Sequence, residues 1–138
     1  MTKLIDCLFK SYKKYSGDIL AANVEELNQA NFICAAHEFK EEAVFFYGNQ
    51  KALELWELSE EEFIGMPSKF TAEEVEREER DKLLAEVKAE GYISNYSGVR
   101  ISSTGKRFMV KDAFVWNILD DNDKVVGQAV KFSEYVIL

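Results

Sequence analysis

The chain has 138 residues, of which 47% are hydrophobic, and a formal net charge of −8. This length and composition predict one globular domain with an ordinary hydrophobic core, and they exclude a disordered chain. The acidic balance opposes binding to phosphate backbones and to anionic lipid, so we expect no nucleic-acid partner and no membrane partner.

The cellular compartment is predicted from what the N-terminus and the cysteines look like. The first 15 residues lack the uninterrupted apolar run of a signal peptide, and no stretch approaches the roughly 20 apolar residues of a membrane span. Cys7 and Cys34 lie far apart, without the spacing of metal ligands, as is typical of free thiols in a reducing compartment. We therefore expect a cytoplasmic protein.

The N-terminal part of the chain is predicted to be helical. Apolar residues recur at helical spacing over residues 3–16, which indicates an amphipathic helix that ends at Gly17. Asn23, followed by Glu26 three residues later, is typical of the start of a second, shorter helix.

Two strands and a cluster of short helices come next. Residues 32–37 and 44–47 are short runs suited to strands. Asn49 can cap the helix that follows the second run, and Ser59 with Glu62 has the pattern of a capping box that opens another short helix.

The longest helix is predicted to follow this cluster. Thr71 and Glu74 form a second capping-box pattern, and Gly91 closes the helix. Glu76 and Arg80 fall near the middle of its buried stripe, in the acid-before-base order that favours an ion pair. The apolar members of the predicted stripe are Ala72, Val75, Leu83, Leu84 and Val87.

After Gly91 the apolar period becomes two, which predicts three antiparallel strands. They cover residues 92–102, 107–119 and 124–134, joined by turns rich in Gly, Ser and Asp. Strict alternation on the middle strand puts Phe108, Val110, Phe114, Trp116 and Ile118 on one face. Because both faces are apolar, the sheet needs two covers. The central helices can supply one, and the N-terminal helix or a partner subunit must supply the other.

This order of elements resembles the PAS arrangement. The stretch FFYGNQKALELWELSEEEFIG, residues 45–65, is similar to the PAS signature, in which a strand ends in Asn and a short helix, a Ser cap and a Gly follow. The resemblance implies an α+β fold in which a five-stranded antiparallel sheet and a helical flank enclose a small-molecule pocket.

A closer resemblance is to the MEKHLA domain, a PAS-related family of stand-alone bacterial proteins and of C-terminal domains in certain plant homeodomain transcription factors. The matching stretches are residues 45–57, 66–84, 91–108, 115–120 and 127–132. The resemblance implies one domain over 1–138, with a helical extension over 1–30 and a PAS-like core over 31–138. It brings no established activity with it.

We expect no cofactor and no metal. Haem-binding PAS domains present their ligand from the long helix, whereas His37 is the only histidine and lies outside residues 71–90. Photoactive flavin PAS domains carry a reactive cysteine shortly after the signature Asn, and neither cysteine lies near Asn49. The acidic turn at 120–123 lacks the Gly and the distal Glu of a calcium loop.

The candidate ligand-binding residues are polar or aromatic side chains of the predicted pocket. They are Asn49, Glu76, Arg77, Arg80, Tyr96, Arg100, Trp116 and His37. In one interpretation Arg77 or Arg80 binds a carboxylate or phosphate group. In the other, Glu76 and Arg80 form an internal ion pair that holds the helix to the sheet. Asn49 also suits a helix cap, and Trp116 also suits the core.

The leading hypothesis is a non-catalytic, PAS-like sensory or interaction module. It would bind a small organic or anionic ligand, or a protein partner, and act as a homodimer. The alternative is a small enzyme of the cone-shaped ketosteroid-isomerase kind, with Asp112 as general base and Tyr96 or His37 assisting. A dimerisation domain with a filled interior is a third interpretation. No nucleophile elbow, Walker loop or dinucleotide fingerprint occurs in the sequence.

Overall fold

A computed structural model describes residues 2–138. Its strands form a single antiparallel sheet in the order β2-β1-β5-β4-β3, with β6 paired to β4. The elements are α1 (Thr2–Ser16), α2 (Val24–Asn28), β1 (Ile33–Phe39), β2 (Ala43–Gly48), α3 (Gln50–Trp56), α4 (Glu60–Phe63), the 3-10 helix η1 (Ser68–Thr71), α5 (Glu74–Glu90), β3 (Tyr92–Ile101), β4 (Arg107–Leu119), β5 (Val125–Phe132) and β6 (Glu134–Ile137). The sequence predicts this order correctly except for η1 and β6, which it does not reveal.

The sixth strand is a continuation of the fifth. Phe114 pairs with Lys131 in β5, and three residues earlier on β4 Lys111 pairs with Glu134 in β6. The register is therefore the same on both sides of Ser133, where the pairing is interrupted. The predicted third C-terminal strand exists, but it extends to Ile137 and is broken in the middle.

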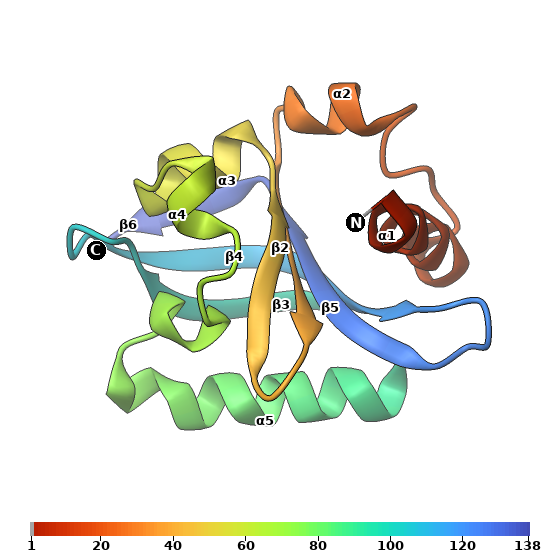
Figure 1. Ribbon diagram of the computed structural model, residues 1–138. Helices are drawn as coiled ribbons and strands as arrows, with labels where there is room; N and C mark the ends of the chain where they lie inside the picture. The colour runs from red at the N-terminus through yellow and green to blue at the C-terminus, as the bar shows by residue number, and fades with distance from the viewer. Residues whose placement is uncertain (1) are drawn as a thin grey trace.

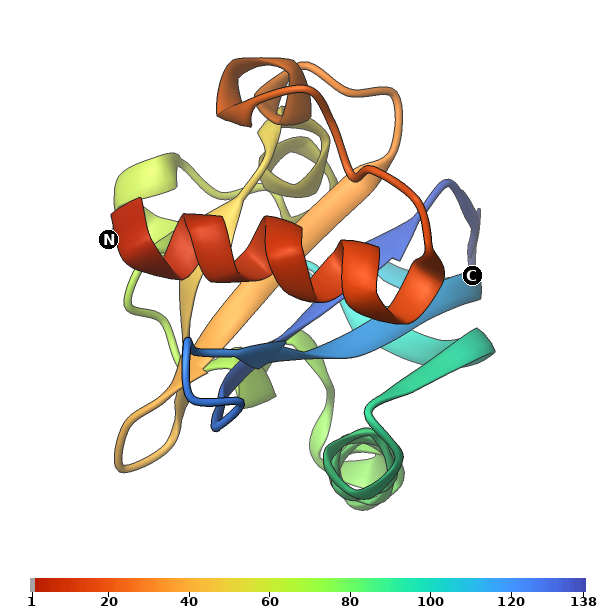
Figure 2. The same cartoon turned by 90° about the vertical axis from the view of Figure 1, so that its right-hand side faces the viewer.

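Helices cover the sheet on both faces (Figure 1). The amphipathic helix α1 crosses one face of the sheet, and Figure 2 shows the molecule from that face. The helices α3, α4, η1 and α5 occupy the other face. Leu8 and Tyr12 of α1 are buried against Trp116 and Ile118 of β4. The chain itself thus supplies both covers, and the second apolar face needs no partner subunit.

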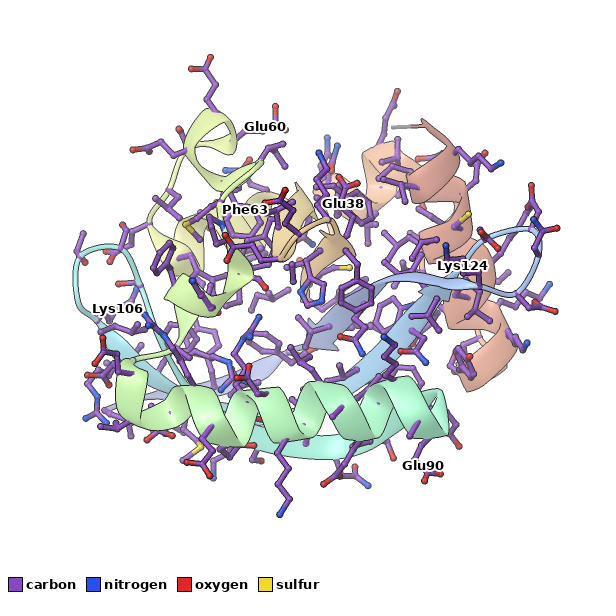
Figure 3. The ribbon with its side chains drawn as sticks, turned by 60° about the horizontal axis from the view of Figure 1, so that its bottom comes forward. Glu38, Glu60, Phe63, Glu90, Lys106 and Lys124 are labelled. Carbon is purple, nitrogen blue, oxygen red and sulfur yellow. The ribbon has the colours of Figure 1, made fainter. Side chains whose placement is uncertain are left out.

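The helical flank buries its apolar residues and turns its charges outward. Phe63 of α4 is fully buried and stacks on Phe45 of β2, with ring centroids 4.2 Å apart. Figure 3 shows Phe63 inside the flank, whereas Glu60 and Glu90 project from the surface. Within residues 2–138, no helix combines the length and the apolar character needed to cross a membrane.

A backbone irregularity at Asp112 changes which residues of β4 face which cover. Asp112 has a positive φ of 54°, and the pairing with β3 shifts register around Tyr96. N-terminal to this point, Phe108 and Val110 pack with the helical flank, but beyond it Trp116 and its even-numbered neighbours pack with α1. The predicted single face of Phe108, Val110, Phe114, Trp116 and Ile118 is therefore wrong. An extra residue in a strand inverts the alternation that follows it.

Two of the predicted capping patterns have different outcomes. Ser59 and Glu62 form the full capping box at α4, with both reciprocal hydrogen bonds present. The predicted box at Thr71 is wrong, because Thr71 belongs to η1 and donates its hydroxyl hydrogen to the Ser68 carbonyl oxygen at 2.8 Å. Helix α5 runs from Glu74 to Glu90, so it starts later than the Thr71 pattern predicts, and Gly91 closes it as predicted.

The buried stripe of α5 also differs from the expected one. Val75 is 82% exposed, because it lies near the start of the helix, where the chain has just left η1. The buried residues are Arg80, Leu83 and Val87, so a charged residue occupies a central position of the stripe.

Asn49 joins four segments through its side-chain amide. Its Oδ1 accepts from the backbone N–H of Ala52, which caps α3, and from that of Cys34 in β1, both at 3.1 Å. Its Nδ2 donates to the carbonyl oxygens of Leu27 and Phe32 at 3.0 and 2.9 Å. All four hydrogen-bonding positions of the amide are used. The residue is fully buried, so each of these bonds is shielded from water.

The irregularity at Asp112 predicts an unusual ranking of substitutions there. We expect Asp112→Val to lower the free energy of unfolding by about 1–2 kcal/mol, because a β-branched residue disfavours the left-handed region. Asp112→Gly should be neutral or stabilising, since Gly adopts this φ freely. Urea unfolding of the three proteins measures the order. Equal stability of the Val and Gly variants would contradict it.

The Asn49 amide predicts a large loss on truncation. We expect Asn49→Ala to lower the free energy of unfolding by about 3 kcal/mol or more, because it leaves several buried backbone groups unpaired. Asn23→Ala is the matched control: Asn23 caps the exposed end of α2 through one hydrogen bond. Its loss should cost about 1 kcal/mol. Thermal unfolding of both variants tests the difference, and similar values would refute the role given to Asn49.

Candidate functional site

A cavity of about 80 Å³ lies between the helical flank and the inner face of the sheet. Residues from β1, β2, α3, η1, α5, β3, β4 and β5 form its wall. They are Ala35, His37, Phe45, Trp56, Ser68, Thr71, Arg80, Leu83, Leu84, Tyr96, Arg100, Val110, Val115, Gln128, Ala129, Val130 and Phe132. The wall is mainly apolar, with a few polar groups that converge on one space, as is usual for small-molecule sites.

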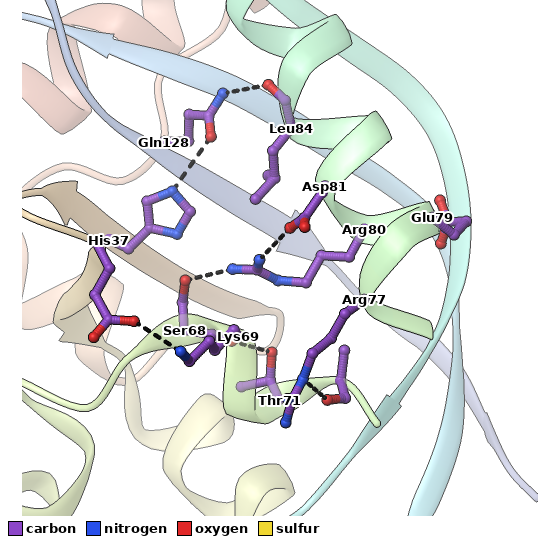
Figure 4. Close-up of polar contacts among 12 residues, drawn as sticks. His37, Ser68, Lys69, Thr71, Arg77, Glu79, Arg80, Asp81, Leu84 and Gln128 are labelled. Carbon is purple, nitrogen blue, oxygen red and sulfur yellow. Dashed lines mark hydrogen bonds and ion pairs between the residues drawn. The ribbon is translucent and has the colours of Figure 1, made fainter. Parts of the chain in front are cut away.

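Arg80 is the most deeply buried charge in the wall. It is 7% exposed and donates from Nη2 to the Ser68 hydroxyl of η1 (Figure 4). Its ion pair is with Asp81, at 3.4 Å, and the Asp81 side chain is 73% exposed. Burial, together with the positive charge of Arg100, lowers the pKa of Arg80 to about 10, so the group stays charged at neutral pH.

Arg100 is the second guanidinium of the cavity. It donates from Nη1 to the carbonyl oxygen of Val99 at 2.7 Å and from Nη2 to the Tyr96 hydroxyl at 3.1 Å. That hydroxyl in turn donates to Glu79 on α5 at 2.7 Å. A Cβ atom at Gly98 would collide with the Tyr96 hydroxyl, so the missing side chain allows Tyr96 to fold back along its own strand toward Arg100.

A polar stripe crosses three adjacent strands on the cavity face. The His37 Nε2 lies 3.3 Å from Oε1 of Gln128, and Gln128 Nε2 donates to Asn117 Oδ1 at 3.2 Å. Gln128 Nε2 also donates to the Leu84 carbonyl oxygen, and Asn117 Nδ2 to that of Lys88. The stripe therefore fastens the C-terminal half of α5 to the sheet.

The stripe fixes the protonation state of His37. Burial, with a further contribution from the charge of Arg80, lowers the pKa of His37 from 6.5 to about 4, so the ring is neutral at pH 7. Since Gln128 uses its amide hydrogens elsewhere, its oxygen accepts from His37 Nε2–H. The other ring nitrogen is then an acceptor, and in Figure 4 the ring lies toward the Arg80 guanidinium.

Trp56 closes the cavity at the end of α3. Its indole nitrogen Nε1 is buried and has no hydrogen-bond acceptor within residues 2–138. The residue after it, Glu57, has a left-handed φ of 59° and accepts from the hydroxyls of Thr104 and Ser102 at the tip of the β3–β4 hairpin. These two bonds lower the pKa of Glu57. The hairpin tip thus holds the end of α3 beside the cavity.

The structure brings four of the eight sequence-predicted residues together. His37, Arg80, Tyr96 and Arg100 line the cavity. Glu76, Arg77, Asn49 and Trp116 are not part of its wall.

Each of these four residues has another environment. Arg77, labelled in Figure 4, donates to the Ala72 carbonyl oxygen at 3.1 Å. Its guanidinium also lies over the Phe70 ring. Glu76 is half-buried and is not the ion-pair partner recorded for Arg80. Asn49 uses its amide for backbone contacts. Trp116 packs with Tyr12 on the α1 face, because the irregularity at Asp112 turns it there.

The enzyme alternative loses its general base. Asp112 is exposed and is not among the residues of the cavity wall, so it cannot act on a molecule held there. The long helix α5 also lies between β2 and β3, whereas the cone-shaped arrangement of that alternative places its long helices before the sheet. Among the described residues, no cluster of three or more acidic, His or Cys side chains could hold a metal ion.

Sequence reasoning missed Trp56, Ser68, Thr71 and Gln128. A polar residue at a cavity-facing position of an otherwise apolar strand is a usable signal, and it applies to Gln128. Ser68 and Thr71 had no such signal, because their place depends on η1, which the sequence does not reveal. Trp56 is a large apolar residue that any core would bury, and burial alone does not separate core from cavity wall.

The lowered pKa of His37 predicts a pH dependence of stability. The unfolded chain takes up a proton near pH 6.5 and the folded chain only near pH 4, so protonation favours unfolding. We expect this residue to remove about 3 kcal/mol of stability as the pH falls from 6.5 to 4. His37→Gln should show a correspondingly smaller loss in urea titrations across this range. Parallel pH profiles of the two proteins would exclude the effect.

Solved structures similar to this chain include PAS and light-oxygen-voltage domains. The PAS domain of a Colwellia psychrerythraea protein has a TM-score of 0.67 and 14% identity, covering 78% of this chain and 90% of that one. A light-oxygen-voltage domain studied with a flavin analogue has a TM-score of 0.66 and 15% identity, covering 91% and 87%. The light-state dimer of the fungal photoreceptor Vivid has a TM-score of 0.61 and 10% identity, covering 76% and 78%. At these identities the likeness shows the fold alone, and it confirms the expected PAS-like α+β architecture.

Sequence families give a more specific result. No curated protein matches the chain. The model of the MEKHLA domain, however, matches residues 2–137, nearly the whole chain, in agreement with the motifs over 45–57 and 91–108. This chain belongs to the MEKHLA domain family.

Proposed function

We propose that this chain is a non-catalytic, PAS-like sensory module that binds a small molecule in the cavity between α5 and the sheet. One observation carries the proposal: the cavity wall joins an apolar majority to the convergent polar groups of His37, Arg80, Tyr96 and Arg100. Such a combination orients a ligand and also removes it from water.

Helix α5 connects the cavity wall with the protein surface, so its position can depend on whether the cavity is occupied. The inner side of this helix contributes Arg80, Leu83 and Leu84 to the cavity wall, while its outer side faces solvent. A ligand that displaces these side chains changes the hydrogen bonds that α5 makes with Ser68 and with Gln128. In this proposal, the position of α5 reports whether the cavity is occupied.

The flavin named for one structural neighbour does not fit this chain. A cavity of about 80 Å³ is roughly half the size of one that holds benzene, and a flavin is far larger. Both cysteines, Cys7 and Cys34, are buried in the cluster on the α1 face, on the other side of the sheet. Burial raises the pKa of Cys34 to about 12, which disfavours a reactive thiolate.

A homodimer, or another protein partner, remains part of the proposal. The expected dimer rested partly on an uncovered sheet face, and α1 covers that face within the chain. Support now comes from β6, where Val136 and Ile137 are about half exposed on opposite faces of the strand. Native mass spectrometry at several protein concentrations measures the oligomeric state.

A cavity-filling variant tests ligand binding. Val110 lines the cavity, so we expect Val110→Phe to abolish the rise in melting temperature that small metabolites cause in the unaltered protein. Filling the space should itself lower the free energy of unfolding by no more than about 3 kcal/mol.

Val99→Phe is the matched control, because Val99 lies on the neighbouring strand and is not part of the cavity wall. Circular dichroism verifies that both variants are folded. The proposal fails if no metabolite class shifts the melting temperature, or if both variants respond as the unaltered protein does.

A further inference from the structure

The cavity carries an unbalanced positive charge. Of the 17 residues in its wall, none is an Asp or Glu, while Arg80 and Arg100 are both charged and buried. The positive charge of Arg100 helps to lower the pKa of Arg80, because it disfavours the protonated guanidinium. Two like charges in a common low-dielectric space repel each other unless an anion lies between them.

The acidic partners outside the wall do not supply that anion. Asp81 contacts Arg80 at 3.4 Å, but its side chain is 73% exposed. Glu79 lies 4.0 Å from Arg100 Nη1, and its side chain is 48% exposed. Ion pairs whose acid is in solvent are weak, because water and salt screen them. Each guanidinium has five N–H donors and makes two hydrogen bonds within the described residues, so both groups keep unused donors for an anion.

A second, independent observation concerns Trp56. This residue is 4% exposed, it lines the cavity, and its indole N–H has no acceptor within the described chain. A buried donor without an acceptor costs free energy, and an acceptor atom in the cavity removes that cost.

The size of the cavity limits the occupant. A cavity of roughly 150 Å³ holds the six carbon atoms of benzene, so about 80 Å³ holds about three to five non-hydrogen atoms. We propose that the cavity takes a short-chain organic monocarboxylate, such as propionate, with its carboxylate between the guanidinium groups of Arg80 and Arg100. The inference rests on the proposed ligand-binding function and names the ligand class.

The chemistry of the wall favours a carboxylate over phosphate. A carboxylate is planar and can accept two parallel hydrogen bonds from one guanidinium fork and a further hydrogen bond from the second guanidinium. Its short alkyl chain matches the apolar groups of Phe45, Val110 and Phe132. Phosphate would place four polar oxygens and up to two charges against the same apolar groups, and much of their desolvation would be uncompensated.

The two tryptophans provide an internal control for the experiment. Trp56 lines the cavity, whereas Trp116 lies on the opposite face of the sheet, and both indole nitrogens are buried without an acceptor among residues 2–138. We expect sodium propionate to move the Trp56 indole resonance in ¹H–¹⁵N spectra of the full chain and to leave the Trp116 resonance in place. Trp56→Phe assigns the two signals, and sodium chloride at equal ionic strength is the salt control.

Arginine variants test the position of the carboxylate. Arg100→Met and Arg80→Met should weaken propionate binding by roughly 10- to 100-fold, since each removes charge-assisted hydrogen bonds. Arg77→Met is the matched control on the same helix, and it should bind as the unaltered protein does. Glu79→Gln should bind about 2- to 5-fold more tightly, because it removes a competing negative charge.

Stability without ligand separates this role from a structural one. We expect Arg80→Met to unfold at an equal or higher urea concentration than the unaltered protein, because an apolar side chain replaces an incompletely neutralised buried charge. A lower midpoint for Arg80→Met, combined with unchanged propionate binding, would assign Arg80 to the scaffold and overturn the inference.

Two outcomes distinguish the inference from the function on which it rests. If neutral metabolites raise the melting temperature through the cavity but propionate moves neither indole signal, the ligand class is wrong and the sensory module stands. If propionate also binds Val110→Phe with unchanged affinity, the anion lies elsewhere and the inference is overturned. Longer acids such as benzoate should bind more weakly than propionate, and tighter binding of benzoate would contradict the size argument.

Discussion

The break in alternation at Asp112 is the constraint on which the rest of this structure depends. It allows one strand to give Phe108 and Val110 to the helical flank, and then Trp116 and Ile118 to α1. The same point faces the interruption at Ser133 on the paired strand, so the two irregularities lie opposite each other in a constant register. Without the break, the bulky aromatic residues of β4 would fill the space in which the cavity lies.

Most of the fold could be predicted from the sequence, because its signals are local. The caps at Asn49 and Ser59 and the stops at Gly17 and Gly91 each depend on a few neighbouring residues. The faces of β4 could not be predicted, since periodicity assumes a regular strand and Asp112 gives no warning of a positive φ. The box at Thr71 failed for a related reason: the same pattern serves a 3-10 turn when tertiary contacts favour it.

Four of the eight residues that the sequence predicts for the candidate site line the cavity. Arg80 stood out because a charged residue occupied an apolar stripe, and it does line the cavity. Arg77, one turn earlier, looked equally suitable, but helical geometry turns it toward Phe70. Residues such as Ser68 and Trp56 join the wall only through packing between distant segments, which no local pattern encodes. Burial of an arginine is thus a stronger indication of a binding site than its position in the sequence, and burial depends on the whole fold.

Several contacts anchor the helical flank to the sheet, among them the Asn49 amide at its start, the Glu57 carboxylate at the hairpin tip, the Glu79 carboxylate beside Tyr96, and Gln128 of the polar stripe near its end. Between these anchors, residues 50–90 take no part in strand pairing apart from an isolated bridge at Pro67. The sheet and the anchors therefore act as a frame, and the flank as an exchangeable insert. Substitutions in the insert can resize or recharge the interior without disturbing the frame, which is how related chains of common architecture could diverge in what they recognise.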